Sequence, residues 1–419
     1  ELSVQGRGNK EEIDTFPGVP LANELSANVV DLCPVGALLD KDFLFSQRVW
    51  FLKSTASIDG LTASGDNLFI EHNQGKVYRV KPRTNLSVNK WWITDEVRYG
   101  WRHIHSEHRL TTPMRRQFGA LVETDYPKAY DDTIEGIAKE TSIGKRLGVL
   151  ISPMLSCEEA FVLATLARRL DPKAVLGVGP VPARGQDKIY PLGADEKSPK
   201  AFKVHAEKAP NARGVRRVLA AIGGSVVEFD DFVKALGHGT GKSDFGAVVL
   251  TGNYPDAWAT DALAKSLGGK FVVLIDTLMN RLVDEASVVL PGATWVEKAG
   301  TFENARGMIQ AFEQAIPVIE TGAASVLGAV GGVVAGEFGR KLGRRAGLVA
   351  HRRPQARGPP SLRSACQAAG VGSMRNASLR VLLFCGEICS LMKVGDGSGN
   401  RSAQTRRKCG YAPCRYQNG

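Results

Sequence analysis

The sequence predicts an α/β protein in which a small β-rich domain precedes a doubly wound parallel sheet. Between residues 106 and 320, short continuous apolar runs alternate with helix-length segments. This alternation is typical of parallel strands covered by helices on both faces. Between residues 47 and 105, apolar and polar residues alternate around Gly and Asn turns, as in half-buried antiparallel strands. A doubly wound sheet binds ligands or partners at the carboxyl ends of its strands.

Individual elements follow from these two patterns. In the first region, two expected strands are separated by a turn at 73–75 and cover residues 67–70 and 76–80. The parallel sheet is expected to contain strands at 147–151, 174–178, 247–250, 271–275 and 287–290. Apolar residues at a helical period predict a helix at 158–170, and two further helices are expected at 211–221 and 256–267.

The positive charge is concentrated at one end of the chain. The 419 residues carry 54 Lys and Arg against 43 Asp and Glu, a net charge of +11. Residues 331–419 hold 16 of the basic and 3 of the acidic residues, a net of +13, so the rest has a net of −2. The first 330 residues therefore give no general signal for nucleic-acid binding.

Cysteine usage indicates a reducing compartment. Two of the seven cysteines, Cys33 and Cys157, precede residue 360, and an odd, sparse set does not form a secreted disulfide framework. The remaining five are expected to be free thiols in a poorly ordered tail: Cys366, Cys385, Cys389, Cys409 and Cys414. No signal peptide is expected at the polar start, and the uncharged run 321–336 is shorter than the ~20 residues of a membrane span.

Three histidines, His103, His105 and His108, are close in sequence. On a strand, the first two would share a face and could bind zinc. No cysteine or second histidine pair is nearby, so a polar linker is favoured. Residues 237–243 contain Gly-Lys-Ser, but Leu236 replaces the first glycine of a phosphate-binding loop, and a flexible turn is favoured there.

Cys33 is followed by Pro34, a pair common among iron–sulfur ligands. A lone cysteine cannot hold a cluster, which needs four ligands. Spacing alone therefore favours a buried structural thiol.

Five segments of residues 1–320 resemble the large iron–sulfur subunit of bacterial NADH:quinone oxidoreductase, respiratory complex I. The first two, Gly-Arg-Gly-Asn-Lys-Glu-Glu-Ile and Leu-Ser-Ala-Asn-Val-Val-Asp-Leu-Cys-Pro-Val-Gly-Ala-Leu, point to this subunit specifically. The last, which begins Val-Val-Leu-Pro-Gly-Ala-Thr-Trp, is shared with the wider molybdopterin oxidoreductase superfamily. The matching segments are 6–13 with 25–38, 75–98, 149–160, 206–215 and 288–310.

The resemblance implies that Cys33 is the fourth ligand of a [4Fe–4S] cluster. In the family, the first three ligands come from a Cys-x2-Cys-x2-Cys run upstream, which this sequence does not contain. We therefore expect the chain to be the carboxyl part of a longer subunit. The intact subunit would bind the cluster, and this chain alone would bind none stably.

Some family members hold one more [4Fe–4S] cluster, and the resemblance places its ligands at Asp59, Thr62, Asp66 and Thr94. None is a cysteine, and iron–sulfur clusters need thiolates. These positions are expected to be degenerate and not to bind a cluster. A calcium site at Asp59 and Asp66 is conceivable, but solvated turn residues are favoured because too few carboxylates converge.

The resemblance also divides the chain into four parts. Residues 1–46 are a remnant of a ferredoxin-like iron–sulfur region, 47–105 a degenerate 4Fe-4S-type β domain and 106–320 a molybdopterin-oxidoreductase-like α/β domain. Glu297, Lys298 and Asn304 match the superfamily motif in the last of these, and a role in domain packing is favoured over catalysis. The divergent basic tail, 321–419, matches no family pattern and is expected to be poorly ordered, from a shifted frame or an extension.

The resemblance implies a fragment of this large iron–sulfur subunit, which passes electrons from NADH toward quinone in the peripheral arm of complex I. The chain alone is expected to be inactive, to contain no molybdenum, and to have no catalytic residue of its own. Its expected partners are other peripheral-arm subunits, with no nucleic acid and no membrane span. The expected location is the bacterial cytoplasm, on the inner face of the cell membrane.

Two alternatives stay open. A molybdopterin-dependent, formate dehydrogenase-like enzyme shares the motif at 288–310. A non-enzymatic protein could bind nucleic acid through its basic tail, with a strong dependence on salt.

Overall fold

A computed structural model describes residues 2–237 and 243–318. The chain divides into two compact units, Glu1–Ala350 and His351–Gly419, and every described residue belongs to the first. The tail expected at 321–419, with its five cysteines, lies outside the described residues.

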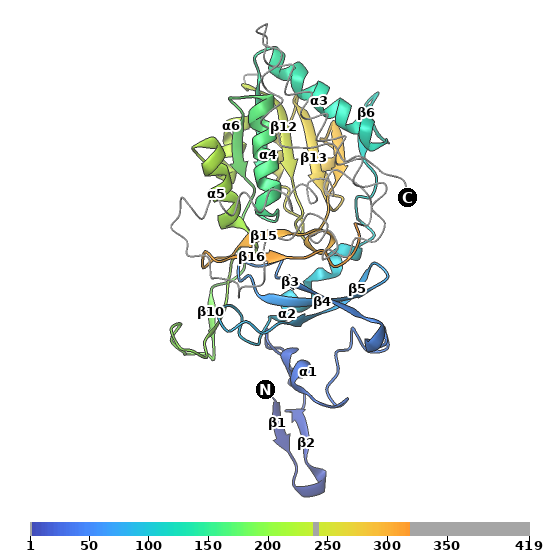
Figure 1. The fold of residues 1–419 in the computed structure, drawn as a ribbon, viewed down its shortest axis with the longest axis vertical. Helices are drawn as coiled ribbons and strands as arrows, with labels where there is room; N and C mark the ends of the chain where they lie inside the picture. The colour runs from blue at the N-terminus through green and yellow to red at the C-terminus, as the bar shows by residue number, and fades with distance from the viewer. Residues whose placement is uncertain (1, 238–242, 319–419) are drawn as a thin grey trace, which may run out of the picture. The chain divides into compact units, whose positions relative to one another are not determined.

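The largest element of the first unit is a seven-stranded sheet with the order β7-β6-β14-β13-β12-β8-β9 (Figure 1). The five strands from β14 to β9 are parallel, and β6 and β7 extend the sheet as antiparallel strands. In chain order the strands are β6 (Met114–Gln117), β7 (Ala120–Glu123), β8 (Arg146–Ile151), β9 (Val175–Val178), β12 (Phe245–Thr251), β13 (Phe271–Asp276) and β14 (Val288–Pro291).

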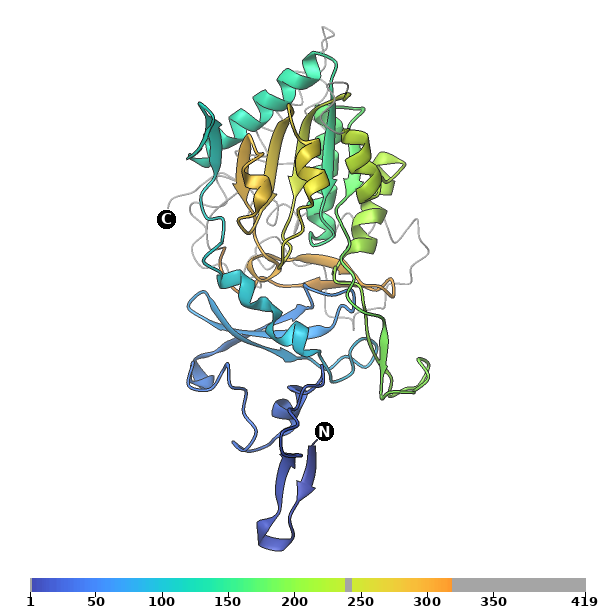
Figure 2. The same cartoon turned by 180° about the vertical axis from the view of Figure 1, so that it is seen from behind.

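Helices cover both faces of this sheet (Figures 1 and 2). In β8, Leu147 and Val149 enter one core, with residues of α3, α4 and α5, whereas Leu150 enters another, with residues of α6 and α7. Burial on both faces explains why the strands are continuously apolar. The helices are α3 (Tyr126–Ser142), α4 (Cys157–Leu170), α5 (Ala212–Gly223), α6 (Phe229–Leu236) and α7 (Asp261–Ser266).

The small domain is an antiparallel sheet of β3 (Lys53–Ile58), β4 (Asn67–Asn73) and β5 (Lys76–Pro82), followed by α2 (Asp95–Tyr99). Its core is completed by a distant part of the chain, the hairpin of β15 (Gly300–Glu303) and β16 (Ile309–Phe312). Trp295, Phe302 and Phe312 join Ile58 and Ile70 in one apolar cluster. The end of the α/β region therefore belongs physically to the small domain.

Residues 2–52, named here the N-terminal arm, contain a hairpin of β1 (Leu2–Gln5) and β2 (Glu12–Thr15) and the helix α1 (Asn28–Leu32). Within the arm only Ala27 and Asn28 are buried. A second hairpin, β10 (Lys188–Tyr190) with β11 (Phe202–Val204), reaches the arm through a 2.8 Å hydrogen bond from the Tyr190 hydroxyl to Glu24. Short 3-10 helices occur at Gly8–Lys10, Val49–Phe51, Gly100–His105, Arg281–Val283 and Trp295–Glu297.

The expected strands and two of the three expected helices are confirmed to within about two residues. The helix expected at 256–267 is too long, because α7 begins only after the Thr260 hydroxyl accepts the Leu263 N–H. Before that point, Trp258 donates to Asp276 and holds the chain in a loop. No helix in the described ranges has the length and hydropathy needed to cross a membrane.

Candidate functional site

Cys33 lies directly after α1 and is partly exposed. Its Sγ is 3.1 Å from the carbonyl oxygen of Val35. Backbone hydrogen bonds from Val35, Leu38 and Ala37 lower the pKa of the Cys33 thiol below its usual range, because they favour the thiolate. The expectation of a buried structural thiol here is wrong.

Cys157 is the buried cysteine. It is the first residue of α4, and its Sγ is 3.5 Å from the side-chain oxygen of Asn211. Burial, followed by the charge of Glu158, raises the pKa of Cys157 to about 12. The two thiols thus differ in kind, since one is accessible and favours the thiolate while the other is buried and neutral.

Helix α1 is fixed to the small domain by polar contacts. The Arg98 Nη2 lies 2.7 Å from a carboxylate oxygen of Asp31 and 3.2 Å from the Asn28 side-chain oxygen. The Asn28 amide also donates to the Ile93 carbonyl at 2.7 Å, and the Ser26 hydroxyl donates to Asp95 at 2.6 Å. Cys33 therefore follows a helix that is anchored to the small domain.

The four degenerate cluster positions are buried. Asp59, Thr62 and Asp66 lie in the loop between β3 and β4, and Thr94 precedes α2, where its hydroxyl accepts the Val97 N–H at 3.3 Å. The interpretation of Asp59 and Asp66 as solvated turn residues is wrong, since they are 0% and 1% exposed.

The Asp59 carboxylate organises this loop. It accepts the Leu61 N–H at 2.8 Å, the Thr62 N–H at 3.2 Å and a short hydrogen bond from the Thr62 hydroxyl. Burial raises the pKa of Asp59 to about 6, and burial together with the charge of Asp59 raises the pKa of Asp66. The oxygens at these four positions do not fit a [4Fe–4S] cluster.

The same loop packs tightly against the end of the α/β region. A Cβ at Gly60 would lie 2.4 Å from the Trp295 ring, and one at Gly65 would lie 2.8 Å from Asn304. The Asn304 amide donates to the Ser64 carbonyl at 3.1 Å, and Gln310 donates to the Gly65 carbonyl at 2.8 Å. Distant residues therefore fix the loop's conformation.

The superfamily-motif residues have packing roles. Lys298 pairs with Glu159 at 2.7 Å, and Glu297 pairs with Arg109 at 3.0 Å, with all four side chains buried. Asn304 holds the small-domain loop, as described above. The favoured packing role is confirmed, although sequence reasoning missed the partners Arg109 and Glu159.

The histidines do not converge. His103 and His105 lie in the 3-10 helix Gly100–His105, not on a strand. The His103 ring stacks on Trp295 with centroids 5.8 Å apart, and the Val77 N–H donates to His105 Nε2 at 3.0 Å. In the described part of the chain, no group of three or more His, Cys, Asp or Glu could hold a metal ion.

At the carboxyl end of β13, Asp276 is buried and fully hydrogen-bonded. Its oxygens accept from the N–H groups of Asn253 (2.8 Å) and Thr277 (2.7 Å), and from the side chains of Trp258 (2.8 Å) and Asn280 (2.9 Å). The chain's own side chains thus occupy the donors and acceptors at this point of the expected ligand-binding edge.

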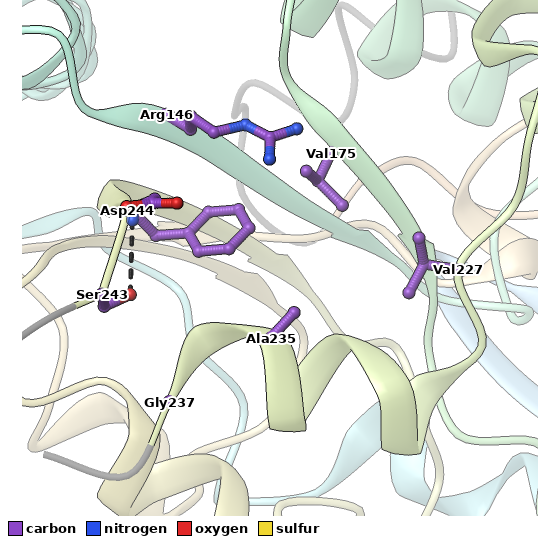
Figure 3. A pocket seen from close by; sticks show the side chains of 8 residues that line it. Arg146, Val175, Val227, Ala235, Gly237, Ser243 and Asp244 are labelled. Atoms are coloured by element: carbon purple, nitrogen blue, oxygen red, sulfur yellow. Dashed lines mark hydrogen bonds between the residues drawn. The ribbon is translucent and has the colours of Figure 1, made fainter. Parts of the chain in front are cut away.

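A cavity of about 310 Å³ lies at the opposite edge (Figure 3). Arg146, Val175 and Phe245, at the amino ends of β8, β9 and β12, line it together with residues of α6. Ser243, whose hydroxyl accepts the Phe245 N–H at 3.3 Å, borders the segment 238–242, which lies outside the described residues. The phosphate-loop question at 237–243 therefore falls outside the description.

Three family models match the chain in order. Residues 1–39 match "NADH-quinone oxidoreductase subunit 3, ferredoxin-like domain". Residues 52–102 match "NADH-ubiquinone oxidoreductase NDSU1/NuoG-like, 4Fe-4S domain", and residues 220–320 match "Molybdopterin oxidoreductase".

Curated relatives agree with these models. The 78 kDa mitochondrial subunit of NADH-ubiquinone oxidoreductase from Neurospora crassa is 35% identical over 170 residues, 41% of this chain and 23% of that protein. The 75 kDa subunit from Reclinomonas americana is 31% identical over 197 residues, 47% of this chain and 27% of that protein. An NADH-quinone oxidoreductase subunit from Rickettsia felis is 33% identical over 173 residues, 41% and 25% of the two chains.

The matches span about a quarter of the length of these relatives. Among solved structures, acetylene hydratase from Pelobacter acetylenicus has a TM-score of 0.41 and 11% identity, covering 70% of this chain and 69% of that one. The chain is a homologue of the large iron–sulfur subunit of NADH-quinone oxidoreductase and carries NuoG-like 4Fe-4S and molybdopterin oxidoreductase domains.

Proposed function

We propose that this chain is part of an electron-transfer subunit of complex I, which passes electrons from NADH to quinone. The observation that carries the proposal is the partly exposed Cys33, whose thiolate is favoured by backbone hydrogen bonds, within a segment that matches a ferredoxin-like domain. The helix before it is anchored to the 4Fe-4S-type small domain through Arg98. That anchorage supports a fixed position for Cys33 relative to the rest of the chain.

In this proposal, Cys33 is one of four ligands of a [4Fe–4S] cluster, which accepts and donates single electrons when bound. The described residues contribute one suitable thiolate, so the other three come from sequence upstream of Glu1. The backbone amides after Cys33 stabilise the thiolate, and Arg98 with Asp31 positions the preceding helix. The small domain, without thiolates at its four former ligand positions, acts as a scaffold.

The proposed partners are other peripheral-arm subunits of complex I, and the proposed location is the inner face of the membrane. The proposed division of the chain is the one expected from the sequence, with an iron–sulfur remnant, a degenerate cluster domain, an α/β domain and a tail. The near-neutral charge of the first 330 residues supports burial within an assembly rather than binding to nucleic acid.

The test is affinity purification of the full chain from its native cells through a carboxyl-terminal tag. We expect other peripheral-arm subunits and NADH:quinone activity in the purified material. Cys33→Ser should remove one [4Fe–4S] signal from its electron paramagnetic resonance spectrum, whereas Cys157→Ser, the matched control, should leave every signal in place. An unchanged spectrum for Cys33→Ser would contradict the proposed ligand.

The isolated chain separates the two parts of this proposal. Iron and labile-sulfide analysis should find no stoichiometric cluster, because three thiolates are absent. A full [4Fe–4S] spectrum from the chain alone would show that its ligands lie elsewhere in the sequence.

The match of residues 220–320 favours one further candidate, a molybdopterin-dependent oxidoreductase. Extraction and oxidation of the purified protein would release a fluorescent pterin if it bound one. We propose that none is released, in keeping with the fully hydrogen-bonded Asp276 at the carboxyl edge of the sheet.

A further inference from the structure

The Asp66 side chain lacks the partners that a buried carboxylate needs. It is 1% exposed, its Oδ2 has no hydrogen-bond partner, and it forms no ion pair with any described residue. Leaving a buried charge without a partner is costly. Asp276, which is equally buried, accepts four hydrogen bonds. The orphaned carboxylate at Asp66 therefore marks a local need for a ligand.

A second buried carboxylate lies beside it. The Asp59 N–H donates to the Asp66 carbonyl at 2.7 Å, so the two residues close the ends of the same loop. The negative charge of Asp59 acts on Asp66, and that of Glu96 acts on Asp59. Arg306 acts on Asp66 only from a distance, since its guanidinium donates to the carbonyls of Ser87 and Val88. The two carboxylates thus lack a paired cation among the described residues.

The loop cannot easily open to hydrate these groups. The Gly60 backbone lies against the Trp295 ring, and the Gly65 carbonyl accepts the Gln310 amide at 2.8 Å. The Ala305 N–H donates to the Ala63 carbonyl at 2.9 Å, which adds a backbone tie to the same loop. The charge must therefore be compensated inside the loop.

We propose that Asp59 and Asp66 bind one divalent, oxygen-preferring cation of the Ca²⁺ class, with the Thr62 hydroxyl as a neutral ligand. Two carboxylates carry a charge of −2, which one divalent ion neutralises. Ca²⁺ accepts mixed sets of carboxylate, hydroxyl and carbonyl oxygens in irregular geometry, whereas Mg²⁺ demands a near-ideal octahedron. Backbone carbonyls and water would complete the shell. The site is structural, and it is independent of the proposed electron transfer.

The first test uses the purified full chain and Ca²⁺ alone. After removal of metal with a chelator, added Ca²⁺ at a hundredfold excess over its Kd should raise the Tm by on the order of 5–10 °C. Tb³⁺, a luminescent substitute for Ca²⁺, should emit on excitation of tryptophan, because Trp295 contacts Gly60 beside the site. Excess Ca²⁺ should quench that emission by displacing Tb³⁺.

The variants Asp66→Asn and Asp59→Asn should each abolish the Ca²⁺-induced rise in Tm and the displaceable Tb³⁺ emission. Asp195→Asn, in an exposed turn, is the matched control and should keep both. In chelator, Asp66→Asn should be at least as stable as the parent chain, since it removes an unpaired buried charge. Elemental analysis of the parent chain, purified without chelator, gives a readout that needs no variant and should find about one bound ion.

A parent chain that contains no ion and shows no response to Ca²⁺ or Tb³⁺ would overturn the proposal. So would a response that persists in both asparagine variants. A Tm that depends on pH but never on Ca²⁺ would instead show that a proton neutralises the pair.

Discussion

The N-terminal arm and the α/β region bury their apolar residues very differently. Thirteen of the 23 exposed large apolar side chains of the described residues lie in residues 2–52, which bury only Ala27 and Asn28. The α/β region buries its strands in two cores, one on each face of the sheet. A two-stranded hairpin without a core is marginally stable in water, and a large exposed apolar surface is typical of an interaction site. Under the proposed function, other polypeptides cover the arm.

The two regions also differ in their ion pairs. Lys298 and Glu159, in the α/β region, are 1% and 3% exposed, whereas Lys188 and Glu24, which tie a hairpin to the arm, are 51% and 31% exposed. Water and salt screen the second pair but not the first. The predictions below compare the two regions directly.

The largest expected effect is that of Lys298→Met. It leaves the Glu159 carboxylate buried without its partner, which should lower the free energy of unfolding by about 3–5 kcal/mol. The exposed counterpart, Lys188→Met, should cost at most about 1 kcal/mol. Urea unfolding of both variants measures the difference, and equal losses would show that burial does not separate the two pairs.

Core truncation should give the next largest contrast. Leu250→Ala removes a fully buried side chain of β12 and should cost about 2–5 kcal/mol. Leu44→Ala, in the arm, removes a side chain that is 40% exposed and should change stability by roughly 0.5 kcal/mol or less. A loss above about 2 kcal/mol for Leu44→Ala would indicate that the arm has a core of its own.

Glycine substitutions test the contact between the small domain and Trp295. In Gly60→Ala the new methyl group meets the indole ring, which should cost about 1–3 kcal/mol. Gly36→Ala, in the arm, adds a methyl group with nothing within 4 Å and should be neutral or slightly stabilising. Thermal unfolding followed by tryptophan fluorescence distinguishes the two outcomes.

The smallest effect is a pH dependence. Burial lowers the pKa of His103 below its ordinary 6.5, so the unfolded chain binds more protons than the folded chain below that pH. Its contribution to stability is therefore lost as the pH falls below about 6.5. His103→Phe keeps an aromatic ring beside Trp295 and should show a shallower fall in Tm between pH 6.5 and 5. His108→Phe, at an exposed position, is the control and should keep the slope of the parent chain.

Local patterns predicted most of the α/β fold. The strands were predictable because they are buried on both faces and are therefore continuously apolar. Helix α4 was predictable from its periodicity, and its start is fixed locally by the capping box of Ser156 and Glu159. The hairpins β10–β11 and β15–β16 were missed, because short strands of mixed polarity have no distinctive period.

The candidate site was less predictable, for a physical reason. Asp59 and Asp66 have the sequence character of turn residues, and their burial depends on Trp295, Asn304 and Gln310 far along the chain. Resemblance located the four degenerate positions, but only the fold showed that their oxygens are withdrawn from solvent. For the cysteines, spacing assigned Cys33 to the interior, whereas α1 leaves it at the surface and α4 buries Cys157.

The return of β15 and β16 to the small domain has a consequence for synthesis. Asn304 donates to the carbonyl of Ser64, which lies 240 residues earlier in the chain. At a synthesis rate of roughly 5–20 residues per second, the loop at 59–66 waits on the order of 10–50 s for that partner to be made. During this interval β3, β4 and β5 are present without the aromatic residues that complete their core. The nascent small domain is therefore a natural client for chaperones until almost the last described residue has left the ribosome.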